Sequence, residues 1–207
     1  LSFTHIGGIM SETTESVDVA VIGAGMVGMS NALFLTERGL KVGVIEAGEI
    51  AKGTSNNSFA WINATSKTSH EAYHRMNALG AAGYRALAEQ WGEARVGVHP
   101  TGMLQWAEPD DEAEQRAMHA RLAQLNEWGY PASAVGFDDL RAMEPHVVFP
   151  EGATGLHAMA DAWLDVPTFV GFVREQIEEA GGFVRERCPA TEICLLYTSD
   201  AADDRLS

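Results

Sequence analysis

Residues 17–46 constrain the fold more than any other part of the sequence, because they read as strand, glycine turn, helix and second strand. The apolar run 17–22 is rich in β-branched residues and ends in glycine, which is typical of a buried parallel strand. The glycines of 23–28 predict a turn, residues 26–38 have helical spacing, and 41–45 predicts the next strand. We therefore expect an α/β fold with a parallel sheet.

Three glycines in this turn, Gly23, Gly25 and Gly28, match the G-x-G-x-x-G pattern of dinucleotide-binding proteins. Gly23 allows the tight turn, Gly25 lets the backbone approach a pyrophosphate, and Gly28 lets the helix pack against the sheet. The helix begins at Met26 and Val27, and its N-terminus offers backbone amides and a partial positive charge to phosphate. The structural alternative is a glycine turn that only packs two elements together.

An acidic residue, Glu46, ends the second predicted strand, and Ala47 follows it. In this position a carboxylate accepts hydrogen bonds from the adenosine ribose hydroxyls and disfavours a 2′-phosphate, so NADP is not expected. FAD and NAD both use this arrangement, and the turn alone does not decide between them.

Four further segments resemble one family of flavoproteins in sequence and in order. They are Gly-Thr-Ser-Asn-Asn-Ser-Phe-Ala-Trp-Ile-Asn at 53–63, Met143-Glu144-Pro145, Trp163-Leu164-Asp165-Val166-Pro167 before a predicted helix, and Ala180-Gly181-Gly182. Together with the glycine turn, these segments are similar to the D-amino-acid oxidase superfamily, which includes glycine and sarcosine oxidases and D-amino-acid dehydrogenases. The resemblance runs from about residue 17 to residue 193.

The resemblance implies an FAD-dependent oxidoreductase that oxidises the C–N bond of a small amine, either a D-amino acid or an N-alkyl glycine. Oxygen or a quinone is then the electron acceptor. The implied fold is a Rossmann-like FAD-binding domain with an inserted α+β substrate domain, truncated at the C-terminus. Because the flavin carries the redox chemistry in such enzymes, no catalytic acid or base is assigned in this chain.

The same resemblance implies FAD contacts from Thr54, Ser55 and Ser58 in the loop after the second strand, and from Ala190 near the end of the matching region. Residues 59–61 are expected near the flavin ring. For the loop residues the alternative is an ordinary Ser- and Asn-rich loop without a ligand. The Ser-His pair that sarcosine oxidases carry at this loop is missing, which weighs against that branch.

The rest of the chain alternates helix and strand. We expect a helix over 68–94, a hairpin-like strand region over 96–106, a helix capped by Asp110 or Asp111 and running to Trp128, a short helix capped by Asp138 and ending at Met143, a strand over 155–159, a helix from Pro167 to Ala180, and a strand over 183–187. Trp91, Trp106, Trp128 and Trp163 are expected in the core or at domain contacts.

This order predicts a second domain inserted into the nucleotide-binding one. The predicted division is an N-terminal extension at 1–16, a first segment of the FAD-binding domain at 17–94, part of the substrate domain at 95–160, a second FAD-binding segment at 161–193, and a tail at 194–207.

The two ends of the sequence indicate that it differs from the natural protein. Residues 194–204 read CLLYTSDAADD, which resembles the translation of an adapter used in transposase-based sequencing libraries. We interpret 194–207 as a non-native, adapter-derived tail, and expect that the natural protein is longer and that this chain is an inactive fragment. Met10 is the expected initiator.

A competing motif, H-E-x-x-H, is formed by His70, Glu71 and His74 on a predicted helix. This spacing places two imidazoles on one helix face, suitable for zinc, with Glu71 as the base. The metzincin continuation is missing, because Asn77 stands where glycine is expected and no third histidine follows. A zinc-dependent hydrolase is the alternative function, and two partly exposed helix histidines without metal are the simpler interpretation.

The charge balance excludes one class of partner. With 14 basic and 29 acidic residues, the formal charge of −15 repels nucleic acid phosphates and anionic lipid.

Two cysteines, Cys188 and Cys194, make no disulfide framework, so we expect a reducing, cytoplasmic compartment. The apolar run 17–35 contains Asp18 and Asn31, so no integral membrane segment is expected, although a dehydrogenase of this family could lie against the inner membrane.

Overall fold

The computed structural model describes residues 2–5 and 13–193 and divides the chain into two compact units. The first unit consists of Leu1–Thr54 with Val173–Ser207, and the second consists of Ser55–Phe172. The proposed adapter-derived tail and Met10 lie outside the described residues. These units meet near residues 54 and 172. The division into FAD-binding and substrate domains stays a prediction.

The first unit is built on a parallel sheet of three strands in the order β11-β4-β3. Strand β3 (Val19–Ile22) leads into α1 (Met26–Thr36), β4 (Val42–Ile45) follows, and β11 (Phe183–Arg185) returns from the far end of the chain. All four residues of β4 are buried, as expected for a central parallel strand covered on both faces. The strand-helix-strand prediction is therefore confirmed.

Gly43 in β4 explains how β11 packs so closely. A Cβ atom at this position would lie 2.6 Å from Cζ of Phe183, so the aromatic ring occupies the space that a side chain would need. The two residues are also register partners in the parallel pair. A glycine in this strand interior thus marks the close approach of a neighbouring side chain.

The predicted N-terminal extension contains two strands, β1 (Ser2–His5) and β2 (Thr13–Ser16), which pair in antiparallel fashion. Glu15 of β2 forms an ion pair with Arg185 of β11, with 2.6 Å between Oε1 and the guanidinium nitrogen. Sequence reasoning assigned no structure to this segment, because its alternation is short and its residues are mostly polar.

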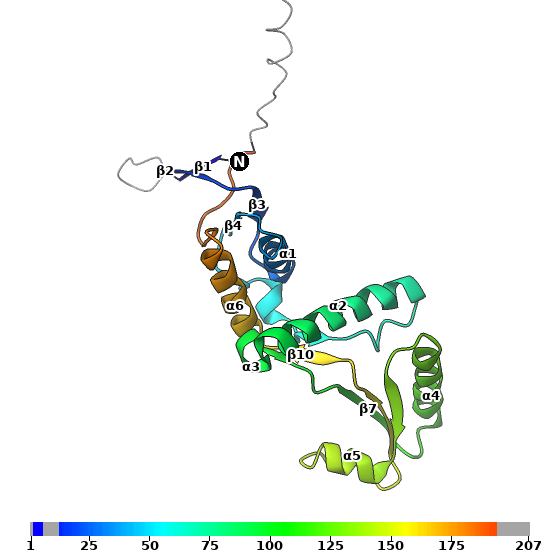
Figure 1. Cartoon of the computed structure of the whole chain (residues 1–207). Helices are drawn as coiled ribbons and strands as arrows, with labels where there is room; N and C mark the ends of the chain where they lie inside the picture. The colour runs from blue at the N-terminus through cyan, green and yellow to red at the C-terminus, as the bar shows by residue number, and fades with distance from the viewer. Residues whose placement is uncertain (1, 6–12, 194–207) are drawn as a thin grey trace, which may run out of the picture. The chain divides into compact units, whose positions relative to one another are not determined.

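The second unit contains an antiparallel sheet in the order β5-β10-β6. Its strands are β5 (Trp61–Ile62), β10 (Ala162–Leu164) and β6 (Val98–His99). The long helix α2 (Glu71–Trp91) and the short α3 (Glu93–Val96) belong to this unit, as does the first part of α6 (Val166–Glu179). Figure 1 shows α2 and α3 following one another along the chain. Gly92, at φ +89°, ends α2, so the single helix expected over 68–94 is wrong in that detail.

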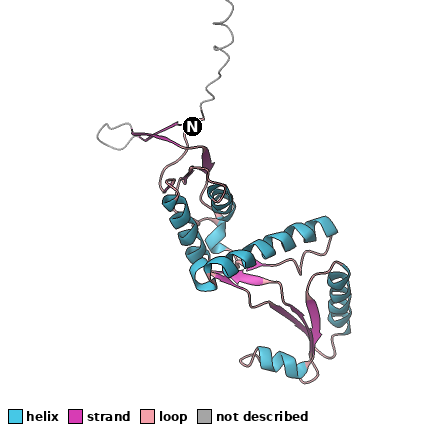
Figure 2. Cartoon of the chain, viewed as in Figure 1, coloured by secondary structure: helices cyan, strands magenta, loops and turns pink. Residues whose placement is uncertain are grey.

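A second antiparallel sheet in this unit has the order β7-β9-β8. It consists of β7 (Met103–Ala107), β9 (Thr154–Ala158) and β8 (Ala132–Val135), with α4 (Glu112–Glu127) beside the strands and α5 (Phe137–Met143) at the other side (Figure 2). Met118 and Leu125 of α4 are buried together with Leu156 of β9. Leu140 of α5 forms a separate small core cluster.

The structure decides three predictions about local structure. The hairpin expected over 96–106 is wrong, because β6 pairs with β10 whereas β7 pairs with β9. Asp111 is confirmed as a helix cap, since its Oδ1 accepts a hydrogen bond from the amide of Glu114 at 2.9 Å. Asp138 is not a cap: α5 begins after Gly136, whose amide donates to Oδ2 of Asp139.

No helix in the described part of the chain is both long enough and apolar enough to cross a bilayer.

Candidate functional site

Two positions of the glycine turn after β3 do not tolerate a side chain. Gly23 has φ +100°, in the region that favours glycine, and its amide donates to the carbonyl of Ile45 at 2.8 Å. A Cβ at Gly28 would lie only 1.9 Å from the carbonyl oxygen of Gly23. Gly23 is therefore required by its backbone conformation, and Gly28 by the close packing of α1 on the turn.

Gly25 is different, because its φ of −78° and ψ of 177° describe an extended backbone that any residue can adopt. It is the N-cap of α1, and no side chain caps the helix there. The first turn of α1, containing Met26 and Val27, carries no acidic residue. Val27 is 79% exposed, whereas Met29 is fully buried, so the start of the helix opens to solvent while the next turn packs inside. A helix end of this kind favours an anionic group.

Glu46, at the end of β4, lies next to this turn. Its Oε2 accepts a hydrogen bond from the amide of Ala24 at 2.9 Å, and its Oε1 accepts one from the amide of Gly48 at 2.8 Å. The backbone amides of Gly48 and then Ala24 lower the pKa of Glu46, which keeps the carboxylate ionised. Each carboxylate oxygen can accept more than one hydrogen bond, so this half-buried group can still accept from ribose hydroxyls.

The segment after β11 reinforces the same edge of the sheet. The amide of Glu46 donates to the carbonyl of Arg185 at 2.8 Å, and the amide of Cys188 donates to the carbonyl of Glu46 at 2.8 Å. The amide of Ile50 donates to Oε1 of Glu186 at 2.7 Å. Sequence reasoning missed the role of Glu186, since a contact across 136 positions leaves no local pattern. Ala190 lies beyond it, exposed and in irregular chain.

The expected FAD contacts are therefore distributed unevenly. Most of them belong to the first unit, where the turn and the end of β4 contribute Gly23, Gly25, Met26, Val27, Gly28, Glu46 and Ala47. Ala190 belongs to the same unit. The 3-10 helix η1 (Thr54–Asn57) crosses the boundary, with Thr54 in the first unit and Ser55 in the second. Ser58 also belongs to the second unit, where its Oγ accepts a hydrogen bond from the amide of Ala60 at 3.1 Å. These three hydroxyl residues, like the residues of the turn, Glu46, Ala47 and Ala190, remain predicted FAD contacts.

The H-E-x-x-H motif does not form a metal centre in this geometry. His70 is the extended N-cap of α2, outside the helix, whereas His74 is only 2% exposed. The Nδ1 atom of His74 lies 3.0 Å from the carbonyl oxygen of Ala64, and its ring packs near Trp128. Within residues 2–5 and 13–193, no group of three His, Cys, Asp or Glu side chains could hold a metal ion.

The interpretation of the pair as two partly exposed histidines is wrong for His74, which belongs to a buried polar group. Tyr130 packs edge-on against it, with ring centroids 5.0 Å apart, and donates its hydroxyl to Oδ1 of Asp161 at 2.5 Å. The same oxygen of Asp161 accepts a hydrogen bond from the amide of Ala64 at 3.2 Å. Asp161 is fully buried. His74 thus supports the loop at Ala64 and has no exposed face for a ligand.

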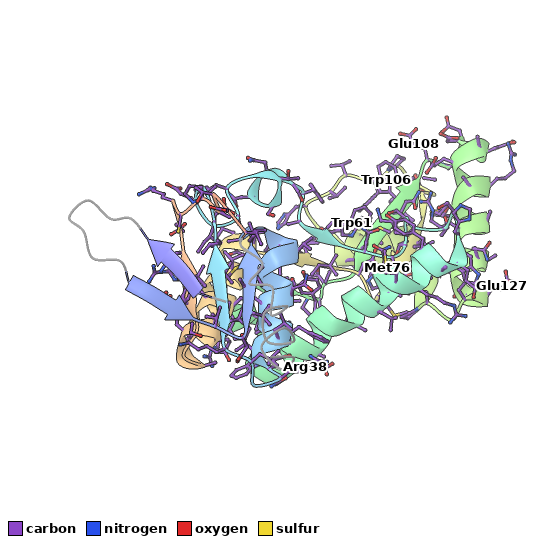
Figure 3. The ribbon with its side chains drawn as sticks, turned by 90° about the horizontal axis from the view of Figure 1, so that it is seen from above. Arg38, Trp61, Met76, Trp106, Glu108 and Glu127 are labelled. Carbon is purple, nitrogen blue, oxygen red and sulfur yellow. The ribbon has the colours of Figure 1, made fainter. Side chains whose placement is uncertain are left out.

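The second unit also contains a cavity of about 640 Å³ that sequence reasoning did not find. Its lining includes Trp163, which is 46% exposed and was expected in the core or at a domain contact. It also includes Phe59 and Trp61, the latter labelled in Figure 3. Strand alternation could have revealed Trp163, because both neighbours, Ala162 and Leu164, are buried and the residue between them faces the other way.

Comparisons with solved structures show the same fold. The glycine oxidase of Bacillus cereus superposes with a TM-score of 0.73 at 22% identity, over 88% of this chain and 49% of its own. The L-proline dehydrogenase of P. horikoshii gives 0.74 at 21% identity, over 88% and 47%. The L-amino acid deaminase of Proteus vulgaris gives 0.73 at 19% identity, over 93% and 44%. This chain thus spans about half the length of these proteins.

Comparison with curated proteins finds a shorter match. The glycerol-3-phosphate dehydrogenase of Mycobacterium leprae is 53% identical over 45 residues, which are 22% of this chain and 8% of that protein. The family described as FAD dependent oxidoreductase matches residues 18–200, which include both units of the structure. That match covers most of the sequence and agrees with the glycine turn, the ionised Glu46 and the parallel sheet. The chain therefore belongs to the family of FAD-dependent oxidoreductases.

Proposed function

We propose that the protein containing this chain oxidises the C–N bond of a small amine, with a D-amino acid or an N-alkyl glycine as the substrate. The first unit is then the FAD-binding domain, and the second contributes to the substrate domain. The observation that carries the proposal is the junction of the glycine turn, the start of α1, which no side chain caps, and Glu46, because it fits an adenine dinucleotide.

Each part of that junction has a separate task in the proposal. The start of α1 holds the pyrophosphate, and Gly25 allows the backbone to approach it. Glu46, fixed by the amides of Ala24 and Gly48, holds the ribose hydroxyls. When bound, FAD accepts the hydride that leaves the carbon next to the substrate nitrogen. The remaining imine hydrolyses to an oxo acid and ammonia or an amine, and oxygen or a quinone takes the electrons.

The amine substrate is supported by the names of the similar structures. Glycine oxidase, L-proline dehydrogenase and L-amino acid deaminase are each named for an amino acid. The glycerol-3-phosphate dehydrogenases match over only 45 residues, so they carry less weight for the substrate. Both configurations of each amino acid belong in a substrate screen, as do sarcosine and glycerol 3-phosphate.

A flavin-retention experiment tests the proposal. The chain, and a longer version expressed from the same gene, are mixed with FAD, desalted, and examined by absorbance spectroscopy. We expect the longer protein to keep a flavin spectrum and to bleach when its amino acid substrate is added without oxygen. If the longer protein retains no flavin, the proposed FAD site is refuted. If only glycerol 3-phosphate bleaches the flavin, the proposed amine substrate is wrong.

Gly25→Ala provides the residue-level version of this test. Its φ of −78° suits alanine, so the variant should fold, while the added methyl group obstructs the pyrophosphate and weakens FAD retention. Gly171→Ala is the matched control, because a Cβ there meets no atom within 4 Å. Equal FAD retention by the two variants would contradict the role given to Gly25.

A further inference from the structure

The cavity of the second unit has the size and lining of a small-molecule site. Its volume of about 640 Å³ falls within the range of pockets that bind compact organic ligands. Aromatic and aliphatic side chains form most of the lining, including Phe59, Trp61, Trp163 and Met103. Two polar side chains also line it, Gln105 on β7 and Arg121 on α4.

Three rings form a row across one face of the β5-β10-β6 sheet. Trp163 is the register partner of Trp61 on one side and of His99 on the other, so all three side chains project from the same face. The rings of His99 and Trp163 are stacked, with centroids 3.7 Å apart and planes 12° apart. This stacking fixes the plane of the Trp163 indole, while 46% of the residue stays exposed. A fixed, exposed aromatic face favours a flat apolar partner.

Arg121 supplies a positive charge to the same cavity. It lies half-buried on α4 and donates one hydrogen bond, from a guanidinium nitrogen to Oε1 of Gln105 at 2.5 Å. Gln105 in turn donates to Oε1 of Glu114 at 2.8 Å, so the amide separates the guanidinium from that exposed carboxylate. In the described part of the chain, no carboxylate lies within ion-pair distance of Arg121. A guanidinium has five N–H donors, so most remain to bind an anion.

We propose that this cavity binds an organic acid with an aromatic body, the ring stacking on Trp61 and Trp163 and the carboxylate pairing with Arg121. The binding itself does not depend on flavin. Its consequence for catalysis rests on the proposed function: the preferred substrate is then an amino acid with an aromatic side chain, larger than glycine or sarcosine.

Phenylacetate tests the binding directly. All five tryptophans lie within Ser55–Phe172, and two of them line the cavity, so tryptophan fluorescence reports on its occupancy. We expect saturable quenching by phenylacetate, and much weaker binding of phenylacetamide, which lacks the charge, and of acetate, which lacks the ring. Equal binding of the acid and the amide, or no saturable signal, would overturn the proposal.

Arg121→Gln and Arg116→Gln form a matched pair of variants. Both residues lie on α4, but Arg116 is exposed, pairs with Glu112 and does not line the cavity. Because a hydrogen bond to a charged group contributes about 1.5–3 kcal/mol, Arg121→Gln should weaken phenylacetate binding by roughly 10-fold to 100-fold. Arg116→Gln should leave the binding unchanged. Similar dissociation constants for the two variants would refute the role of Arg121.

Gln105→Glu keeps the guanidinium but gives it an internal carboxylate partner, and it covers the case in which Arg121→Gln misfolds. It should reduce phenylacetate binding while the circular dichroism spectrum stays that of the parent. Unchanged binding in a folded Gln105→Glu protein counts against the site. The flavin-retention experiment is scored separately on the longer protein. If that protein binds phenylacetate but does not retain FAD, the proposal for this cavity stands and the proposal for the FAD site fails.

Discussion

Gly28→Ala is the substitution whose cost follows most directly from the coordinates. The new Cβ would lie 1.9 Å from the carbonyl oxygen of Gly23 and 3.4 Å from Cγ1 of Val21. Since carbon and oxygen approach no closer than about 3.3 Å in ordinary contacts, the helix must retreat by an amount on the order of 1 Å. The turn cannot move easily, because the amide of Gly23 donates a hydrogen bond to the carbonyl of Ile45. Meanwhile Met29, fully buried one residue further, loses packing.

Overpacking of this kind costs about 1–3 kcal/mol of unfolding free energy. For a chain of this length each kcal/mol lowers Tm by about 2–4 °C, so we expect a decrease of roughly 2–12 °C. Thermal denaturation followed by far-ultraviolet circular dichroism measures it. Gly83→Ala on α2 is the control, because its Cβ meets nothing within 4 Å and alanine should stabilise the helix by about 0.5–1 kcal/mol. A Gly28→Ala protein that melts with the parent would refute the reasoning.

Three further predictions concern named polar groups. Tyr130→Phe should lower the stability by about 1–3 kcal/mol in urea denaturation, because it leaves buried Asp161 without its hydroxyl donor. Burial and then that hydrogen bond raise the pKa of Tyr130, so its contribution to stability should be fully present below the unfolded pKa of about 10 and be lost as the pH rises above it. A Phe variant with the same alkaline loss as the parent would contradict this. The amides of Gly48 and Ala24 lower the pKa of Glu46, so its carboxylate contributes stability above pH 4.5 that is lost as the pH falls. The unfolding free energy of Glu46→Gln should therefore decline less steeply in acid than that of the parent. Asp111→Ala should destabilise the chain by about 1 kcal/mol through loss of the α4 cap, and an unchanged urea midpoint would argue against the cap.

The parts of the fold that could be predicted are those with a local cause. Helix α1 and strands β3 and β4 follow from apolar runs separated by a glycine turn, and the α4 cap follows from one aspartate at the right spacing. The pairing of β6 with β10 and of β7 with β9 was not predictable, because strands of two to five residues carry little pattern and the pairs join distant segments. The hairpin prediction failed for that reason: a Pro-Thr-Gly turn at 100–102 resembles a hairpin loop, yet its two flanking strands enter different sheets.

The candidate sites divide in the same way. The dinucleotide turn and Glu46 lie within 24 residues of one another, so their spacing and the predicted strands and helix between them indicated the site. The cavity of the second unit draws on residues from 59 to 163. The register of Trp61 with Trp163 depends on a strand pairing, and the hydrogen bond between Gln105 and Arg121 depends on the packing of α4. No local sequence pattern encodes either. At His74 a local pattern was misleading: the H-E-x-x-H spacing is typical of a metal site, but the side chain is buried and supports a loop.

The three glycines of the turn separate what the fold requires from what a ligand would require. Gly23 needs its positive φ and Gly28 needs the absence of a Cβ, so both are explained by the folded chain itself. Gly25 has ordinary backbone angles, and its conformation gives no reason for glycine. A close approach by the dinucleotide does supply one, because a pyrophosphate bound at the start of α1 needs the backbone uncovered. Stability and flavin binding should therefore respond to different glycines: Gly28→Ala lowers Tm, whereas Gly25→Ala lowers FAD retention at an unchanged Tm.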